Sequence, residues 1–261
     1  MKQILIIPRL DEINASLELC EKYGLGFEYN DFFMPKILDN QAICDDLIER
    51  YKNENLPEFC TLHGAFFDVI PFSPDEKIRE ISDLRIRQSL DVAQKIGAKA
   101  VIFHTNYNPF LNAPAYVSSW TEQNSAYWSG ILGEFSDVNI YLENMFDTAP
   151  DIMETLAENL KSHANFGICL DYAHAALTAV SQREWVEKLG RFVKHIHIND
   201  NDLISDLHSA IGEGKIDWSE FYDLYDKFMT GASILIETTP LPNQRKSLEK
   251  LSADGFIKQF T

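Results

Sequence analysis

Eight short apolar runs recur along the 261 residues, and stretches with helical periodicity lie between them. The runs are QILII (3–7), LGFEY (25–29), FCTLH (59–63), AVIFH (100–104), VNIYLE (138–143), FGICLD (166–171), VKHIHI (193–198) and SILIE (233–237). Segments 15–24 and 82–97 carry apolar residues at three- and four-residue spacing and end in glycine. A strand–helix alternation repeated eight times predicts an α/β fold, a single (β/α)8 TIM barrel that spans residues 1–261 as one domain.

A doubly wound open sheet is the rival fold for the same alternation. Its common dinucleotide-binding version needs a glycine-rich G-x-G-x-x-G turn after the first strand, and the sequence has none there. No low-complexity linker divides the chain. We therefore expect one barrel domain.

The composition limits the classes of binding partner that the protein can have. The chain has 23 Lys and Arg residues against 40 Asp and Glu residues, a formal charge of −17, which disfavours a nucleic-acid partner. The four cysteines form no CxxC pair, and no apolar run has the length of a membrane span. We expect a cytoplasmic protein with reduced thiols and no membrane partner, either a monomer or a homo-oligomer.

Five of the expected strands end in a residue able to bind a metal ion, and a sixth, VKHIHI, carries one next to its last position. Side chains alternate along a strand, so in VNIYLE the apolar Ile140 and Leu142 share one face and Glu143 lies on the other. The same alternation points the terminal polar residues inward at the carboxyl mouth of the barrel, where catalytic residues of such barrels lie. These residues are His63, His104, Glu143, Asp171, His197 and Glu237.

A single polar residue at a strand end is usually only solvated or locally hydrogen-bonded. Several carboxylates in one cavity would repel one another and protonate unless a cation neutralised them. We therefore expect a divalent metal cofactor, Zn, Mn, Co or Mg, with the mixed imidazole and carboxylate set favouring the first three. His195 also points inward but lies deeper, and we interpret it as a hydrogen-bonded core histidine.

Seven motifs together resemble the xylose-isomerase-like TIM-barrel superfamily, which contains sugar phosphate isomerases and epimerases and also endonuclease IV. They are TLHG, FHTNY, YLEN, LDYAH, HIHINDND, DLHSAIGEGKIDW and ILIET, in order from about residue 60 to the end. The resemblance to the isomerase branch implies one metal ion held by Glu143, Asp171, His197 and Glu237. The resemblance to the endonuclease branch implies two or three zinc ions and adds His63, His104, His174, Asp206 and His208.

The favoured function is a metal-dependent isomerase or epimerase that acts on a sugar, sugar phosphate or related polyol by proton transfer next to a carbonyl. By resemblance to the epimerases, Glu143 and Glu237 would be its acid–base pair, and His174 would contact a substrate hydroxyl. We expect further substrate contacts from His63, His104, Asn106, Phe66, Trp120 and Lys215. Other aromatic residues in the loops are weaker candidates, each more often ordinary packing: Tyr29, Phe32, Phe67, Tyr107 and Phe146.

Two alternatives stay open. The first is a multi-zinc phosphoester hydrolase of the endonuclease IV kind, which the complete ligand set favours. The acidic composition and the loops NDFFMPKILDNQ and GAFFDVIPFSPDEK, which offer few basic residues to hold phosphates, argue against it. The second is a degenerate barrel that only binds a ligand, and the intact set of inward charges weakens that hypothesis.

Overall fold

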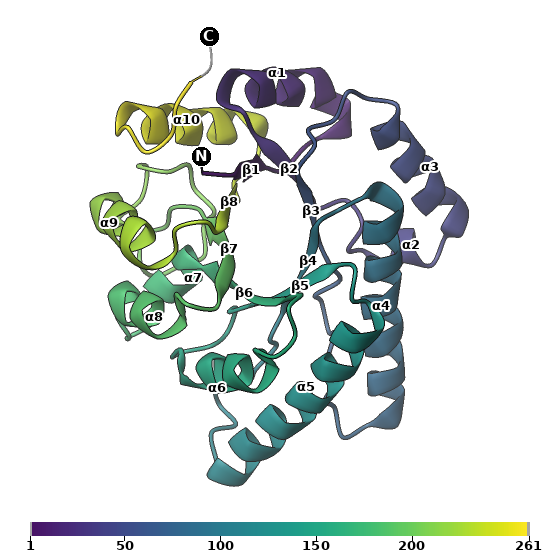
Figure 1. Ribbon diagram of the computed structural model, residues 1–261. Coiled ribbons are helices and arrows are strands. Elements are labelled where there is room, and N and C mark those ends of the chain that lie inside the picture. Colours follow the sequence, from purple (N-terminus) through teal and green to yellow (C-terminus); the bar gives the residue numbers. More distant parts are fainter. Residues whose placement is uncertain (1, 260–261) are drawn as a thin grey trace.

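The eight strands close into a ring of parallel neighbours. The computed structural model describes residues 2–259. Its strands follow one another around the barrel in chain order, and β8 pairs with β1 to close it. Figure 1 shows this ring at the centre, with the helices around it. The predicted (β/α)8 barrel is confirmed.

The strands are β1 (Ile4–Ile6), β2 (Gly26–Tyr29), β3 (Cys60–His63), β4 (Ala100–His104), β5 (Asn139–Glu143), β6 (Phe166–Asp171), β7 (Val193–Ile198) and β8 (Ser233–Ile236). The helices are η1 (Leu10–Glu12), α1 (Ile13–Tyr23), α2 (Pro35–Leu38), α3 (Gln41–Lys52), α4 (Glu76–Ile96), α5 (Pro114–Glu134), α6 (Asp151–Leu160), α7 (Tyr172–Ala176), α8 (Gln182–Leu189), α9 (Trp218–Phe228) and α10 (Leu241–Ala253).

Each predicted strand boundary lies within one residue of the boundary in the structure. Strands β4, β6 and β7 have the predicted bounds, and the other strands are shorter than predicted by one or two residues. Helix α4 begins at Glu76, six residues before the predicted start at 82, because the Asp75 side chain caps it by accepting a hydrogen bond from the Lys77 N–H. The apolar periodicity that suggested position 82 misses this polar first turn.

The predicted alternation along the strands is also confirmed. Ile140 and Leu142 belong to the large core cluster, which includes the buried faces of the helices, and Glu143 does not. A separate small cluster of Leu5, Ile7 and Leu235 fills part of the opposite face of β1 and β8. The interior of such a barrel is usually packed with branched apolar side chains. Here its middle layer also holds four buried polar residues, Glu28, Thr61, His195 and Ser233.

The long loop between β7 and α9, residues 199–217, is organised around one buried carboxylate. Asp200 Oδ2 accepts hydrogen bonds from the Gly212 N–H and from Trp218 Nε1, and its Oδ1 accepts one from the Ile216 N–H. Gly214 passes so close that an added Cβ would lie 2.2 Å from Asp200 Oδ1, which requires glycine there. The motif HIHIND…GEGKIDW therefore encodes one turn wrapped around Asp200.

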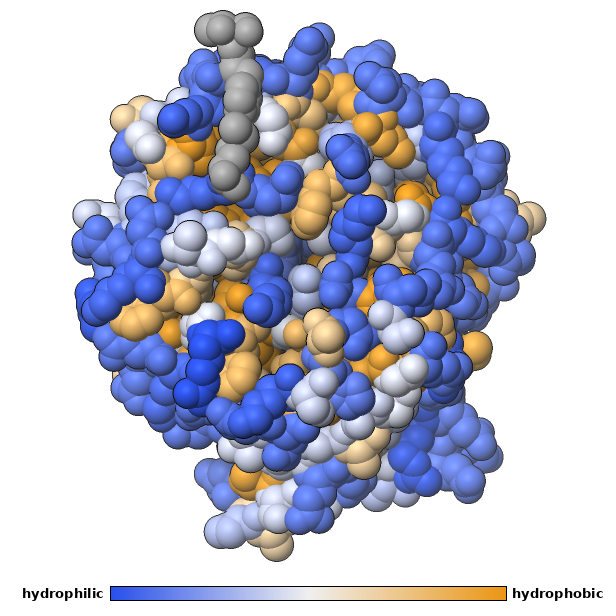
Figure 2. Space-filling view, in the orientation of Figure 1, coloured by the Kyte–Doolittle hydropathy of each residue, from blue (hydrophilic) through white to orange (hydrophobic). Residues whose placement is uncertain are grey.

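The outer surface of the barrel is formed mainly by the polar sides of the helices. The face in Figure 2 is mostly hydrophilic, with apolar residues between the charged ones. No helix within residues 2–259 combines the length and apolarity needed to cross a bilayer. Cys20, Cys44, Cys60 and Cys169 are all buried free thiols.

We expect Asp200→Asn to lower the free energy of unfolding by at least about 2 kcal/mol, because the new amide NH₂ would face buried N–H donors. Urea denaturation measures this. Asp202→Asn is the matched control, since Asp202 uses only Oδ1 to accept from Ile204 and Ser205, and asparagine keeps that acceptor. Equal stability of the two variants would show that Asp200 does not organise the loop.

Candidate metal centre at the carboxyl mouth

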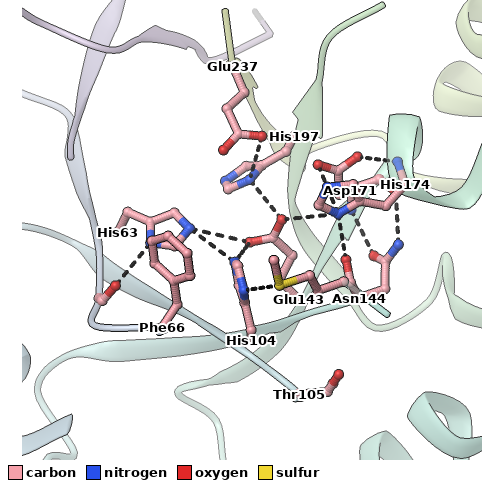
Figure 3. A network of polar contacts seen from close by, with 12 residues as sticks. His63, Phe66, His104, Thr105, Glu143, Asn144, Asp171, His174, His197 and Glu237 are labelled. Carbon is pink, nitrogen blue, oxygen red and sulfur yellow. Dashed lines mark hydrogen bonds and ion pairs between the residues drawn. The ribbon is translucent and has the colours of Figure 1, made fainter. Parts of the chain in front are cut away.

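Four side chains from adjacent strands meet at the carboxyl mouth. Glu143, Asp171 and His197 end or nearly end β5, β6 and β7, and Glu237 directly follows β8. One ligand-capable atom of each lies within 4.8 Å of those of the other three. Figure 3 shows these side chains pointing toward one another. We call these four residues the four-ligand group.

Glu143 joins this group to two histidines on β3 and β4. Its Oε1 lies 3.2 Å from Nδ1 of His197, while its Oε2 lies 3.3 Å from Nε2 of His104 and 3.7 Å from Nε2 of His63. The His63 and His104 rings are perpendicular neighbours with centroids 5.0 Å apart. Because one carboxylate faces both sets, His63, His104 and Glu143 form a second group beside the first.

A third group forms where the 199–217 loop folds back over the mouth. Asp206 Oδ2 lies 3.4 Å from Nε2 of His174, and Asp206 Oδ1 lies 3.2 Å from Nε2 of His208. Two contacts place the histidines: Asp171 Oδ1 accepts from the His174 N–H, and His208 Nδ1 lies 2.9 Å from the Glu237 carbonyl oxygen. All nine residues named from the sequence as possible ligands thus fall into three adjoining groups, here called the nine-residue centre.

Strand β2 contributes a buried acid that the sequence analysis missed. Glu28 is fully buried, and its Oε2 accepts a hydrogen bond from Thr61 Oγ1 at 2.7 Å. The same oxygen lies 3.0 Å from Nε2 of His195, and Oε1 lies 3.2 Å from Nε2 of His197. Glu28 thereby leaves Nδ1 of His197 facing Glu143 and Glu237. The alternation in GFEY could have revealed this residue, because Phe27 and Tyr29 belong to the outer core and Glu28 to the interior.

His195 lies one layer below the mouth, as expected of a core histidine. Its Nδ1 lies 2.7 Å from Ser233 Oγ, and its Nε2 faces Glu28. One ligand-capable atom of His195 also lies within 4.8 Å of those of Cys169 and His197. Burial raises the pKa of the Cys169 thiol well above its usual range, so Cys169 is a poor ligand beside the carboxylates.

The electrostatics of the centre are those of charges removed from water. Burial, with the charges of Glu237 and Glu143, raises the pKa of Asp171 to about 7 despite the opposing effect of His174. Burial also opposes ionisation of Glu143, yet His197 and His104 outweigh it and hold the pKa of Glu143 well below its usual range. Burial and the nearby His104 lower the pKa of His63, which keeps its imidazole in the neutral, metal-binding form.

This donor set fits a divalent cation. None of the described N–H or O–H groups makes a well-aligned hydrogen bond to Glu143 Oε2, Asp171 Oδ2 or Glu237 Oε2, although all three oxygens are buried. Buried acceptors without donors are costly, and three carboxylates beside one imidazole are ligands that Mn²⁺, Zn²⁺ and Co²⁺ accept. The residues present therefore suit a bound metal ion.

The residues predicted to contact substrate are only partly brought together. Phe66 lies at the centre, with its ring 5.1 Å from that of His63 and 4.9 Å from that of His104. Asn106 lies in the neighbouring loop and donates from Nδ2 to the Val69 carbonyl. Lys215 is exposed in the turn around Asp200, and no described contact joins it to the nine-residue centre.

The structure does not bring Trp120 to the site, which corrects that prediction. Trp120 belongs to α5 rather than to a strand-end loop, is 2% exposed, and packs edge-on against Phe72 and Tyr107. Of the weaker aromatic candidates, Tyr29 and Phe32 are also buried in the core. Phe67 and Phe146 lie exposed at the mouth.

The protein is thus an α/β barrel that carries a cluster of side chains able to bind metal ions at its carboxyl mouth. The chain belongs to the xylose isomerase-like TIM barrel family, which matches residues 17–254. The resemblance seen in the motifs is confirmed.

Three relatives show the range of the family. An uncharacterized protein of Methanocaldococcus jannaschii is 30% identical over 217 residues, 79% of this chain and 71% of that protein. The fructoselysine 3-epimerase of Shigella flexneri is 25% identical over 204 residues, 69% of this chain and 68% of the enzyme. A probable endonuclease 4 of Mycobacterium leprae is 28% identical over 185 residues, 64% of this chain and 68% of its own.

Solved structures agree in fold over nearly the whole length. A D-tagatose 3-epimerase-like protein superposes with a TM-score of 0.77 at 26% identity, covering 97% of this chain and 96% of the other. A Thermus thermophilus protein soaked with zinc chloride superposes with a TM-score of 0.74 at 22% identity, covering 97% of each chain. The family, the fructoselysine 3-epimerase and the D-tagatose 3-epimerase-like protein point to sugar isomerases and epimerases.

The position of Glu28 behind His197 predicts that Glu28→Gln weakens Mn²⁺ binding about 10-fold, because a neutral amide no longer increases the basicity of the imidazole. Calorimetric titration of the metal-free protein with MnCl₂ measures this. Glu21→Gln on the exposed face of α1 is the matched control for charge. Thermal unfolding of both variants verifies the fold, and equal Mn²⁺ affinity in the two would remove Glu28 from any role at the centre.

Proposed function

We propose that this protein is a divalent-metal-dependent isomerase or epimerase that acts on a sugar or related polyol by proton transfer next to a carbonyl. The observation that carries the proposal is the approach of two carboxylates, those of Glu143 and Glu237, to the same imidazole nitrogen of His197. Nδ1 of His197 lies 3.2 Å from Glu143 Oε1 and 3.5 Å from Glu237 Oε2. Two acids that face one small space can serve the two faces of one substrate carbon.

The four-ligand group would hold the metal ion. When bound, a divalent cation polarises carbonyl and hydroxyl oxygens of a substrate and offsets negative charge that develops on them. The remaining chemistry belongs to the side chains around it.

Glu237 is the better placed of the two acids to meet a substrate first. Its side chain is 12% exposed, whereas that of Glu143 is 1% exposed. Burial opposes ionisation of Glu237, but His197 and His208 outweigh it and lower the pKa of Glu237, so its carboxylate is ready to accept a proton. In an epimerisation Glu237 would take the proton from the carbon beside the carbonyl. Glu143, itself ionised, would relay a proton from the imidazolium of His104, whose Nε2 lies 3.3 Å from Glu143 Oε2, to the opposite face of that carbon, and exchange with solvent would then return Glu237 and His104 to their starting protonation states. The reverse reaction exchanges these roles.

The third group would orient the substrate. Burial opposes the charged form of His208, yet Asp206 and Glu237 raise the pKa of His208 to about 10, which makes it a cationic donor at neutral pH. Its ring is 35% exposed at the mouth. His174, on the other side of Asp206, would donate to a substrate hydroxyl.

The relatives and the charge support a small neutral substrate. The names of the Shigella flexneri relative and of the D-tagatose 3-epimerase-like structure are those of ketose epimerases. A net charge of −17 opposes the approach of polyanions.

A second candidate is phosphoester hydrolysis at a centre of two or three zinc ions. The groups His63–His104–Glu143 and His174–Asp206–His208 favour it, because one metal ion in the four-ligand group does not need them as ligands. The endonuclease relative supports the same candidate. A hydrolase that cuts nucleic acid would need basic side chains at the mouth.

We expect Glu237→Gln to lower kcat for ketose epimerisation at least about 100-fold, because an amide cannot accept the proton. Loss of hydrogen–deuterium exchange at the epimerised carbon, followed by NMR in D₂O, measures the step itself, and metal content is determined in the same samples. Glu249→Gln on the exposed side of α10 is the matched control. Full exchange in Glu237→Gln would exclude Glu237 as the base.

A parallel assay separates the two candidates. The metal-loaded protein is tested for cleavage of a DNA duplex with one abasic site, and zinc per chain is determined by elemental analysis. The proposal predicts ketose epimerisation without duplex cleavage. Cleavage together with two or three bound zinc ions would replace it by the hydrolase.

A further inference from the structure

An apolar cavity of about 580 Å³ opens at the mouth beside the nine-residue centre. The loops after β3, β4 and β5 enclose it, and its apolar walls come from Phe66, Phe67, Ile70, Phe110, Met145 and Phe146. Its volume falls in the usual range of small-molecule sites.

The cavity is one side chain away from the histidines of the centre. Phe66 lines the cavity and packs its ring against both His63 and His104, as Figure 3 shows. Met145 lines it as well, and its Sδ lies 2.9 Å from Nδ1 of His104. A molecule that reacts at the centre can therefore extend over Phe66 and Met145 into this cavity.

The walls of the cavity expose large apolar side chains to water, which is unfavourable in free energy. Phe110 is 92% exposed, Phe67 62% and Phe146 55%, and no other phenylalanine within residues 2–259 is counted among the exposed large hydrophobic residues. Exposed apolar residues gathered in one patch mark a binding surface, since scattered ones carry no such meaning. Here the three exposed phenylalanines line one cavity.

The polar groups in the lining are mostly engaged within the loops. Asn106 Nδ2 donates to the Val69 carbonyl, and Asn108 Oδ1 accepts from the Phe110 N–H. The one charged lining residue is Asp68, an acid, and the lining contains no lysine or arginine. Sugar hydroxyls would find few partners here, and a phosphate would find no cation.

We infer that this cavity binds an apolar aryl or alkyl substituent carried by the substrate, while the polyol part of the same molecule reacts at the nine-residue centre. The inference rests on the proposed function and specifies its substrate class: a neutral or amino-linked ketose derivative with an apolar group, without a phosphate. Phe67, Phe110 and Phe146 supply the aromatic contacts, and Phe66 separates the two halves of the ligand.

The test uses two probes that differ only in the substituent, 1-(benzylamino)-1-deoxy-D-fructose and 1-(methylamino)-1-deoxy-D-fructose. Calorimetry with the metal-loaded wild-type protein is expected to give at least 10-fold tighter binding of the benzyl compound, with a more negative heat-capacity change. In Phe110→Ser/Phe146→Ser the affinity for the benzyl compound falls to that for the methyl compound.

Ile43→Ser/Leu84→Ser is the matched control, because both residues are exposed apolar residues outside the cavity, at 47% and 44%. This variant is expected to keep the 10-fold preference. Equal affinity of the two probes in the wild type overturns the inference. So does a preference that survives Phe110→Ser/Phe146→Ser.

Turnover of the same probes keeps the two proposals separate. Benzyl preference without epimerisation of either compound supports the cavity assignment and contradicts the proposed function. Epimerisation of both compounds, bound with equal affinity, supports the proposed function and contradicts the cavity assignment.

Discussion

The structure depends on holding three carboxylates and an imidazole together out of water. Like charges at this distance repel, and burial removes the solvent that would screen them. Histidine side chains beside the carboxylates reduce this repulsion. His197 and His104 face Glu143, and His174 faces Asp171. These contacts keep Glu143 ionised, yet the pKa of Asp171 still rises to about 7. The remaining imbalance is what a divalent cation would remove, and this links the fold to the proposed chemistry.

Two further sets of polar contacts hold the side chains at the mouth in position. Below it, the chain Ser233–His195–Glu28–His197 gives each imidazole nitrogen a polar neighbour inside the barrel. Beside it, Asp200 binds the turn that carries Asp206 and His208 back over the four-ligand group. The polar residues in the middle of this barrel therefore position the side chains of the centre. Most barrels have aliphatic side chains in that place.

Sequence reasoning succeeded where one periodic rule decides the outcome. Alternation along the strands predicted the inward side of Glu143 and His197, and the motifs supplied His174, Asp206 and His208. The same alternation points Glu28 inward, but the prediction for that strand named only Tyr29, its last residue. Trp120 was misplaced because loop and helix were not separated at Pro114, where α5 begins. The cavity wall could not be predicted, because it joins three loops whose separation in space depends on the closed barrel.

The most direct test of the account is where a metal ion binds. Crystals of the protein grown with MnCl₂ can be measured at a wavelength at which manganese scatters anomalously. The account predicts an anomalous peak between the carboxylates of Glu143, Asp171 and Glu237 and Nδ1 of His197. Full occupancy elsewhere with no peak among these four side chains, or side chains that turn away from one another in the presence of excess metal, would contradict it.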